Sequence, residues 1–264
     1  MIIGINITLL LALILPPIIY AGIIYLTSPY KSIDIKRGLY HIMAGFTSVF
    51  ILSIIHLVIP SWGSSSIDFF NTFFFIAPKE ELVKLLMFLA IGGIFSRRDD
   101  HPVATMFYMG MIGLGFALVE NIQYVMMYGE QVLLIRIFTA TIAHMLFGIF
   151  MGYWIAKGNI DNGRGNRSVF GVLMAKNQDL KRYIYIFLGW MAAVGYHGLW
   201  NYNLMISTQA YPGFSDISST PIMIMLIFFG LVGAKFASKD LNDSYRMRLK
   251  TKPKTIKTKD KSKS

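Results

Sequence analysis

Residues 67–95 read IDFFNTFFFIAPKEELVKLLMFLAIGGIF, an apolar stretch interrupted near its midpoint by two lysines and two glutamates. A helix that crosses a bilayer core needs roughly 20 consecutive apolar residues, and this stretch is longer than that. An ionisable side chain inside such a helix costs at least ~2.5–3.5 kcal/mol. The stretch therefore predicts a membrane helix whose charged residues are functional. Pro78 predicts that the helix is kinked, tilted or divided into two pieces.

The composition of the whole chain agrees with a membrane protein. Of 264 residues, 55% are hydrophobic and only 15% are charged, whereas a soluble domain usually carries about 25% charged residues. A soluble globular protein is therefore nearly excluded. The absence of cysteine also excludes disulfides, Cys-ligated zinc, iron–sulfur clusters and a cysteine nucleophile.

The distribution of Lys and Arg predicts the topology. Every second connection between apolar stretches is basic, as around Lys31–Arg37, at Arg97 and Arg98, and in the long 157–182 loop, while the others contain neither residue. By the positive-inside rule, the N-terminus lies outside and the C-terminus in the cytoplasm. The sequence thus predicts an all-α, multi-pass helix bundle in the cell membrane with about seven (seven to eight) spans, at residues 3–26, 39–60, 67–95, 103–127, 131–156, 183–206 and 219–238.

The net charge of +11 is concentrated at the C-terminal end. Residues 239–264 contain ten Lys or Arg and three Asp, so this segment holds +7 of the total. We expect residues 1–238 to form one integral membrane domain and residues 239–264 to form a disordered cytoplasmic tail. Basic segments beside a membrane attract anionic lipid, so lipid is the expected partner of the tail and nucleic acid is not.

Polar residues on four consecutive predicted helices lie at a similar depth in the outer half of the membrane. Helical spacing places Glu80 and Lys84 on one face, and His197 and Asn201 on another. One shared cavity accounts for the whole set, which comprises Glu80, Glu81, Glu120, His144, His197 and Asn201. We expect a supporting part for four further residues, with Lys84 offsetting the charge of a carboxylate and holding it in place: Lys84, Phe116, Asn121 and Gly148. Arg136, near the outer end of its helix, is expected to extend toward the interface.

Such a cavity contains the groups that hydrolyse a peptide bond. A carboxylate can take a proton from water and return it to a leaving amine, histidines can transfer protons or bind a metal, and the Asn201 amide can donate to an oxyanion. The sequence lacks G-x-S-x-G, an intramembrane aspartate pair and H-E-x-x-H. A proton-coupled transporter and a non-catalytic scaffold for other membrane helices stay open as alternatives.

Four ordered motifs carry a resemblance to a known family: Glu80-Glu81-x-x-Lys84, Phe116-x-x-x-Glu120-Asn121, His144-x-x-x-Gly148 and His197-x-x-x-Asn201. Over residues 67–206 the chain resembles the PrsW family of intramembrane proteases, relatives of the type II CAAX prenyl endopeptidases. The resemblance implies cleavage of a membrane-anchored protein near the outer face, as in site-1 cleavage of an anti-sigma factor. It further implies that Glu80 activates water beside Glu81, that Glu120 and His144 assist, and that His197 and Asn201 stabilise the oxyanion.

Two departures separate the chain from the prenyl endopeptidases. Those enzymes carry E-E-x-x-x-R and F-x-x-x-H, whereas Lys84 and Glu120 occupy the corresponding motifs here. The catalytic type stays open between a metal-free glutamate mechanism and a zinc-dependent one, with Glu80, His144 and His197 as the zinc ligands. The sequence favours the glutamate mechanism and no cofactor, because two adjacent glutamates point about 100° apart on a helix and cannot easily bind one ion together.

Overall fold

The computed structural model describes residues 7–27, 33–58, 69–95, 101–161, 180–210 and 215–251, and every regular element within these ranges is a helix. The all-α prediction is therefore confirmed for this part of the chain. The elements are α1 (Ile7–Thr27), α2 (Ile35–Val58), α3 (Phe69–Asn71), the π-helix η1 (Thr72–Ile76), α4 (Ala77–Phe95), α5 (Val103–Tyr128), the 3-10 turn η2 (Glu130–Val132), α6 (Leu133–Phe138), α7 (Ala140–Asp161), α9 (Leu180–Ala210) and α10 (Ser215–Thr251).

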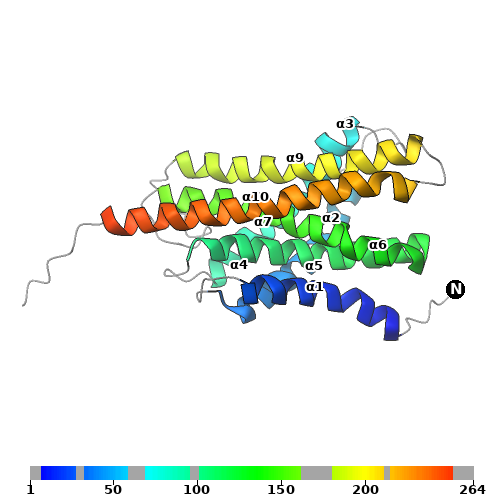
Figure 1. The fold of residues 1–264 in the computed structure, drawn as a ribbon, viewed down its shortest axis with the longest axis horizontal. Helices are drawn as coiled ribbons and strands as arrows, with labels where there is room; N and C mark the ends of the chain where they lie inside the picture. The colour runs from blue at the N-terminus through cyan, green and yellow to red at the C-terminus, as the bar shows by residue number, and fades with distance from the viewer. Residues whose placement is uncertain are drawn as a thin grey trace, which may run out of the picture.

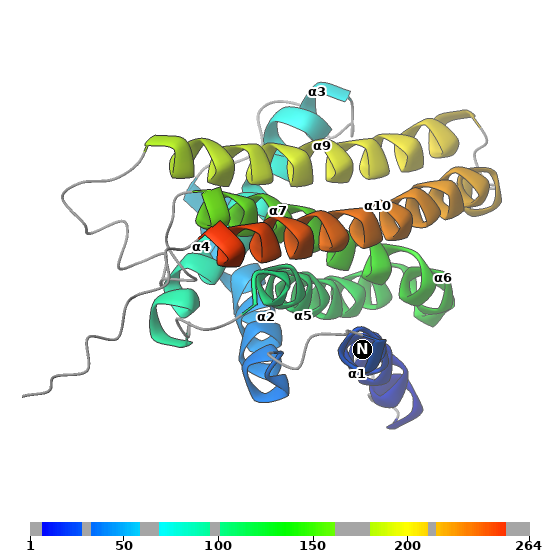
Figure 2. The ribbon, with the colours of Figure 1, turned by 60° about the vertical axis from the view of Figure 1, so that its left-hand side comes forward.

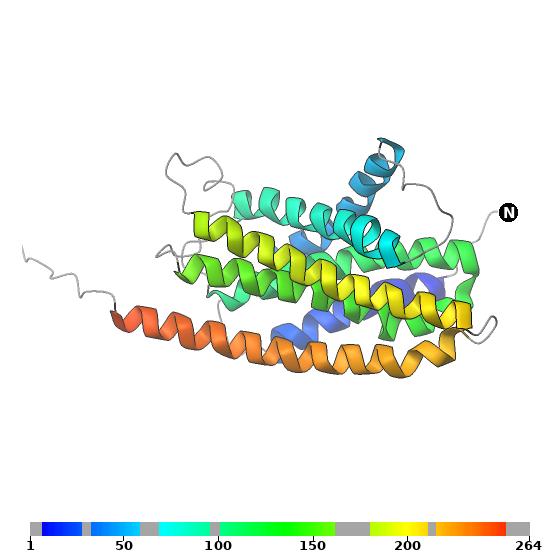
Figure 3. The same cartoon turned by 90° about the horizontal axis from the view of Figure 1, so that it is seen from above.

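Helices α5, α7, α9 and α10 lie side by side in an elongated bundle, with α1 and α9 on opposite sides and α2 inclined to the others (Figures 1 and 2). The central helix is α5, which is buried along most of its length and packs chiefly against α7 and α2. Helix α7 also packs against α9, and α10 runs along an outer edge of the bundle (Figure 3). Polar side chains of α4, α5, α7 and α9 are buried within this bundle, among them Glu81, Lys84, Asn121, His144 and His197.

Two reciprocal pairs of glycines let α5 approach its neighbours closely. A Cβ on Gly148 of α7 would strike the carbonyl oxygen of Met109, and one on Gly113 of α5 would strike that of His144. Gly45 and Gly115 make the same exchange between α2 and α5. Small residues at such positions allow backbone contact between membrane helices. The Gly113–Gly148 pair brings the helix that carries His144 against the helix that carries Glu120.

Within the part of the chain that the structure describes, four helical segments are long and apolar enough to cross a membrane by length and composition: Ile35–Val58, Val103–Tyr128, Glu130–Ile160 and Pro221–Lys250. Residues Ala12–Leu26 form a shorter apolar helix. The apolar sequence of helix α4 is interrupted by four ionisable residues, Lys79, Glu80, Glu81 and Lys84. The count of seven spans and the orientation of the termini stay predictions.

Two of the predicted spans are interrupted. Before Pro78, residues Thr72–Ile76 form a π-turn, in which the N–H of Ala77 donates to the carbonyl of Thr72. The proline ring removes a backbone donor and disfavours a regular helix through the preceding turn, so the third predicted span consists of pieces, as the sequence allowed. The fifth is broken at Thr139, between α6 and α7, and the sequence analysis did not anticipate this break.

The prediction that disorder begins at Lys239 is wrong for residues 239–251. Helix α10 continues to Thr251 and extends beyond the ends of the other helices (Figure 1). Contacts with α7 stabilise this extension, because the Lys157 ammonium lies 2.7 Å from the Asp240 carboxylate and Arg248 donates to the carbonyls of Asn159 and Ile160. Residues 252–264 lie outside the described part of the chain.

Candidate active site

The two adjacent glutamates of α4 face different partners. Glu81 is completely buried, and its Oε1 accepts hydrogen bonds from Lys84 Nζ at 2.6 Å and from His197 Nδ1 at 2.8 Å. Lys84 was expected to pair along the face it shares with Glu80, but it pairs with Glu81. Residues three and four positions apart are both neighbours on a helix, so Lys84 can reach either glutamate. His197 on α9 donates to the same Glu81 oxygen as Lys84, which accounts for the choice of Glu81.

Lys84 links α4 to α7. Its ammonium also donates to His144 Nδ1 at 3.0 Å and lies 4.0 Å from the centre of the Phe116 ring. Since Nδ1 accepts a hydrogen bond from the ammonium, the single N–H of the neutral His144 ring lies on Nε2. That N–H donates to Glu120 Oε2 at 2.8 Å. Glu120, His144, Lys84, Glu81 and His197 thus form one continuous network across α5, α7, α4 and α9.

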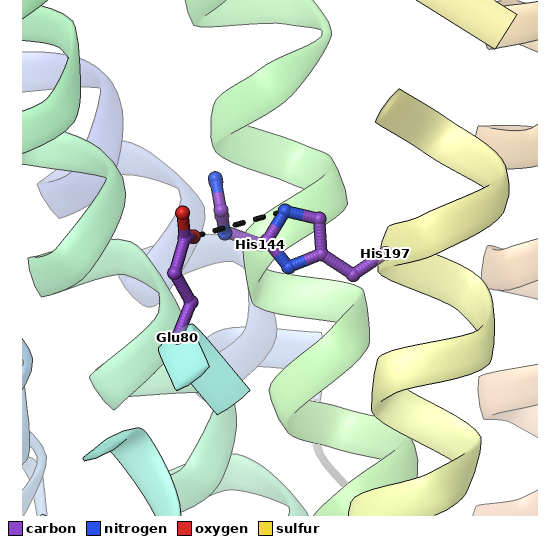
Figure 4. Close-up of side chains that lie close together, drawn as sticks. All are labelled: Glu80, His144 and His197. Carbon is purple, nitrogen blue, oxygen red and sulfur yellow. Dashed lines mark ion pairs between the residues drawn. The ribbon is translucent and has the colours of Figure 1, made fainter. Parts of the chain in front are cut away.

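Glu80 has an oxygen that lacks a hydrogen-bond donor. Its Oε2 is buried with no hydrogen-bond partner in the described structure, and it faces His197 Nε2 at 3.7 Å (Figure 4). Because His197 donates its Nδ1–H to Glu81, its Nε2 presents a lone pair. Two acceptors therefore face each other across the gap. A proton, a water molecule or a cation between them would satisfy both.

The same gap has the ligand chemistry of a zinc site. One ligand atom from each of Glu80, His144 and His197 lies within 4.8 Å of the other two (Figure 4), and two histidines with one glutamate are a known ligand set for catalytic zinc. His197 donates its other ring N–H to a carboxylate, as zinc-bound histidines usually do. His144 must exchange one of its two hydrogen bonds to become a ligand. These are the three residues that the sequence analysis named for the zinc alternative.

The remaining predicted residues surround this centre in different ways. Asn201 lies one turn beyond His197 on α9, half-buried and without a hydrogen bond to the described residues. The hydrogen-bond partners of the Asn121 side chain are not the three possible zinc ligands, since its Nδ2 donates to Thr141 Oγ1 at 2.9 Å. Phe116 packs against both Lys84 and the His144 ring, whose centroid is 5.2 Å away. Gly148 is at the helix contact described above.

Arg136 belongs to the site, although the sequence analysis expected it to extend toward the interface. It turns inward, and its Nη2 donates to Glu120 Oε2 at 2.7 Å while its Nε donates to Asn121 Oδ1 at 2.9 Å. The outward expectation fails because a buried carboxylate and an amide on α5 lie within reach. The adjacent Glu120-Asn121 at the same predicted depth was the signal in the sequence that could have identified this partner.

Comparison with known proteins identifies the family of the chain. Residues 39–232 match the sequence profile described as PrsW family intramembrane metalloprotease, and the matched region contains all the residues of the network. The chain belongs to the PrsW family. It is thus a membrane protein of an intramembrane protease family, and the predicted family is confirmed.

Three relatives show how far the similarity extends. Protease PrsW of Oceanobacillus iheyensis is 26% identical over 65% of this chain and 69% of its own length. Protease PrsW of Geobacillus kaustophilus is 26% identical over 57% of this chain and 66% of its own, and that of Bacillus subtilis is 24% identical over 85% and 93%. No solved structure matched the chain significantly.

Proposed function

We propose that the protein is an endopeptidase that hydrolyses a peptide bond in a membrane-anchored protein, near the outer face of the membrane. The observation that carries this proposal is the convergence of Glu80, His144 and His197, from three different helices, on one buried gap. A membrane-bound anti-sigma factor, cut in a site-1 step, is the substrate that the family resemblance suggests. A network of ionisable groups inside a membrane bundle is costly and usually marks a functional site.

We favour the zinc-dependent form of this peptidase over the metal-free glutamate form. Two adjacent glutamates cannot easily bind one ion together, but only Glu80 has to bind it, because Glu81 faces Lys84 and His197 instead. Three carboxylates against Lys84 and Arg136 give a formal charge of −3 + 2 = −1 with neutral histidines. The donor set Glu80, His144 and His197 fits a divalent cation, and such an ion supplies a Lewis acid that promotes ionisation of water.

The residues of the chain then have distinct parts in hydrolysis. Glu120 has the most accessible carboxylate of the network, with 19% of its side chain exposed, so it can take the proton of the water that attacks the carbonyl carbon. It returns that proton to the amine nitrogen as the C–N bond breaks. The Asn201 amide, one turn beyond His197 on α9, donates to the carbonyl oxygen as negative charge develops there. Lys84 offsets the charge of Glu81, which holds His197 in orientation, and Glu120 holds His144 through its Nε2–H.

The proposal is tested with purified protein in liposomes that also contain fluorescently labelled single-span membrane proteins, an anti-sigma factor among them. We expect cleavage, one zinc ion per chain, loss of cleavage after chelation and recovery on addition of Zn²⁺. Glu120→Gln is expected to retain zinc and to lose activity. Full activity in metal-free protein would support the glutamate mechanism and contradict the zinc proposal. Failure to cut any of these proteins would contradict the peptidase itself.

We further propose that all seven predicted spans cross the membrane, with the N-terminus outside, as one integral domain. The alternation of basic and non-basic connections supports this orientation. Because the chain has no cysteine, a single introduced cysteine is its one thiol, and the labelling of that thiol reports the orientation. We expect Ser65→Cys to react with an impermeant maleimide on intact cells and Ser168→Cys to react only after permeabilisation. The reverse pattern would contradict the proposed orientation.

A further inference from the structure

The break between α6 and α7 is capped by side-chain hydroxyls. A helix end leaves backbone carbonyls without intrahelical partners, and inside a membrane each of them has to be satisfied by the protein. At this end, Thr139 Oγ1 donates to the carbonyl of Ile135 at 2.6 Å, and Tyr20 of α1 donates to that of Ile137 at 3.1 Å. Thr141 Oγ1 donates to the carbonyl of Arg136 at 3.1 Å. Three successive carbonyls thus have donors, which makes the break a stable feature of the fold.

The capped break fixes the direction of Arg136. Thr141 binds the backbone of Arg136 and also accepts a hydrogen bond from Asn121 Nδ2 at 2.9 Å, while Asn121 Oδ1 accepts from Arg136 Nε at 2.9 Å. The three residues therefore form a closed ring of contacts. The guanidinium carbon lies 3.6 Å from the centre of the Tyr124 ring, a distance at which a cation is attracted to the face of the ring.

A second nitrogen of the Arg136 guanidinium fixes one oxygen of Glu120. Arg136 Nη2 and His144 Nε2 both donate to Oε2, at 2.7 and 2.8 Å. Glu120 Oε1 receives no hydrogen bond from the side chains that the structure describes around it. One oxygen is thus held from two sides, and the other keeps its lone pairs available to accept a proton. This is the arrangement that a proton acceptor requires.

We propose that Arg136 is a positioning residue, which holds the Glu120 carboxylate against His144 so that Oε1 can accept the proton of the attacking water. The inference rests on the proposed peptidase function, in which Glu120 is the proton acceptor. Only 11% of the Arg136 side chain is exposed, so Arg136 does not simply extend to the membrane interface. A misplacement of a reacting group by about 1 Å can cost about 100-fold in rate.

The test compares Arg136→Gln, Arg136→Lys and Arg136→Ala in the liposome assay, on the membrane protein that the wild type cuts. We expect Arg136→Gln to lower kcat about 100-fold with little change in KM, because the substrate contacts stay intact. Arg136→Lys should restore part of the rate, since a lysine supplies the charge without the rigid fork. Added guanidinium ion should restore part of the activity of Arg136→Ala, an effect that a purely structural arginine would not show.

Arg37→Gln is the matched control. Arg37 also pairs with a carboxylate, that of Asp34 at 3.2 Å, and lies 5.8 Å from the Tyr108 ring. Tyr108 precedes Glu120 by 12 residues on α5, a separation of roughly 18 Å along the helix. We expect Arg37→Gln to keep the kcat of the wild type. A similar loss in both variants would show a general effect of removing an arginine and would overturn the positioning part.

A second measurement is independent of catalysis. Thermal unfolding of Arg136→Gln, Glu120→Gln and the double variant forms a double-mutant cycle. We expect the double variant to unfold at about the temperature of Arg136→Gln alone, because the pair is already broken. Additive shifts would overturn the inference even if no substrate were cut. If the wild type cuts its substrate and Arg136→Gln keeps full kcat, the inference fails and the peptidase stands.

Discussion

Glu80→Gln is expected to lower kcat by about 10³-fold or more while leaving the protein as stable as the wild type. Glu80 Oε2 has no hydrogen-bond partner in the described structure and contacts neither Lys84 nor Arg136. With a neutral His197, loss of the Glu80 charge breaks no ion pair of the fold, whereas the gap between Glu80 and His197 loses its carboxylate. The measurements are kcat on the identified membrane protein, the melting temperature and the zinc content, which should fall with activity.

Glu130→Gln is the control for this substitution. Glu130 lies exposed in η2, so it reports the effect of removing one negative charge near the same end of the bundle. We expect it to leave kcat and zinc content unchanged. If Glu80→Gln cut its substrate at the wild-type rate, the gap between Glu80 and His197 would not be where water is activated, and the proposed mechanism would be wrong.

The sequence predicted the helices and the depth of the site because both depend on short-range periodicity. Glu80, Glu120, His144 and His197 were placed at one level from helix length and spacing alone, and the structure brings all four into adjacent positions. Residue depth along a helix follows directly from a rise of 1.5 Å per residue. The same argument named the three possible zinc ligands.

The choice of partners could not be predicted in this way. Glu80 and Glu81 are both within reach of Lys84 along the helix, and only the approach of His197 from α9 decides between them. Arg136 could extend toward the interface or turn inward, and its direction depends on a break at Thr139 whose donors come from α1 and α7. The helical start of the basic tail depends on α7 in the same manner, through Lys157 and Asp240. Each of these outcomes is set by a second helix, which a single sequence does not place.

Lys84→Met is expected to destabilise the protein by about 3–5 kcal/mol, the usual cost of leaving a buried charge without its partner. Lys84 and Glu81 are almost completely buried, and Glu81 would keep only the hydrogen bond from His197. His144 would also lose its contact with the ammonium. The measurement is the free energy of unfolding in mixed micelles, with activity measured below the transition.

Lys157→Met provides the matched comparison, because the Lys157–Asp240 pair is as short as the Lys84–Glu81 pair but lies partly exposed. Exposed ion pairs contribute about 0–1 kcal/mol, so we expect a small loss for this variant. The double variant Glu81→Gln with Lys84→Met should recover part of the stability lost in Lys84→Met, since no unpaired charge then remains at that pair. Equal losses in the two lysine variants, or no recovery in the double variant, would contradict the view that Lys84 stabilises the fold chiefly by offsetting the charge of Glu81.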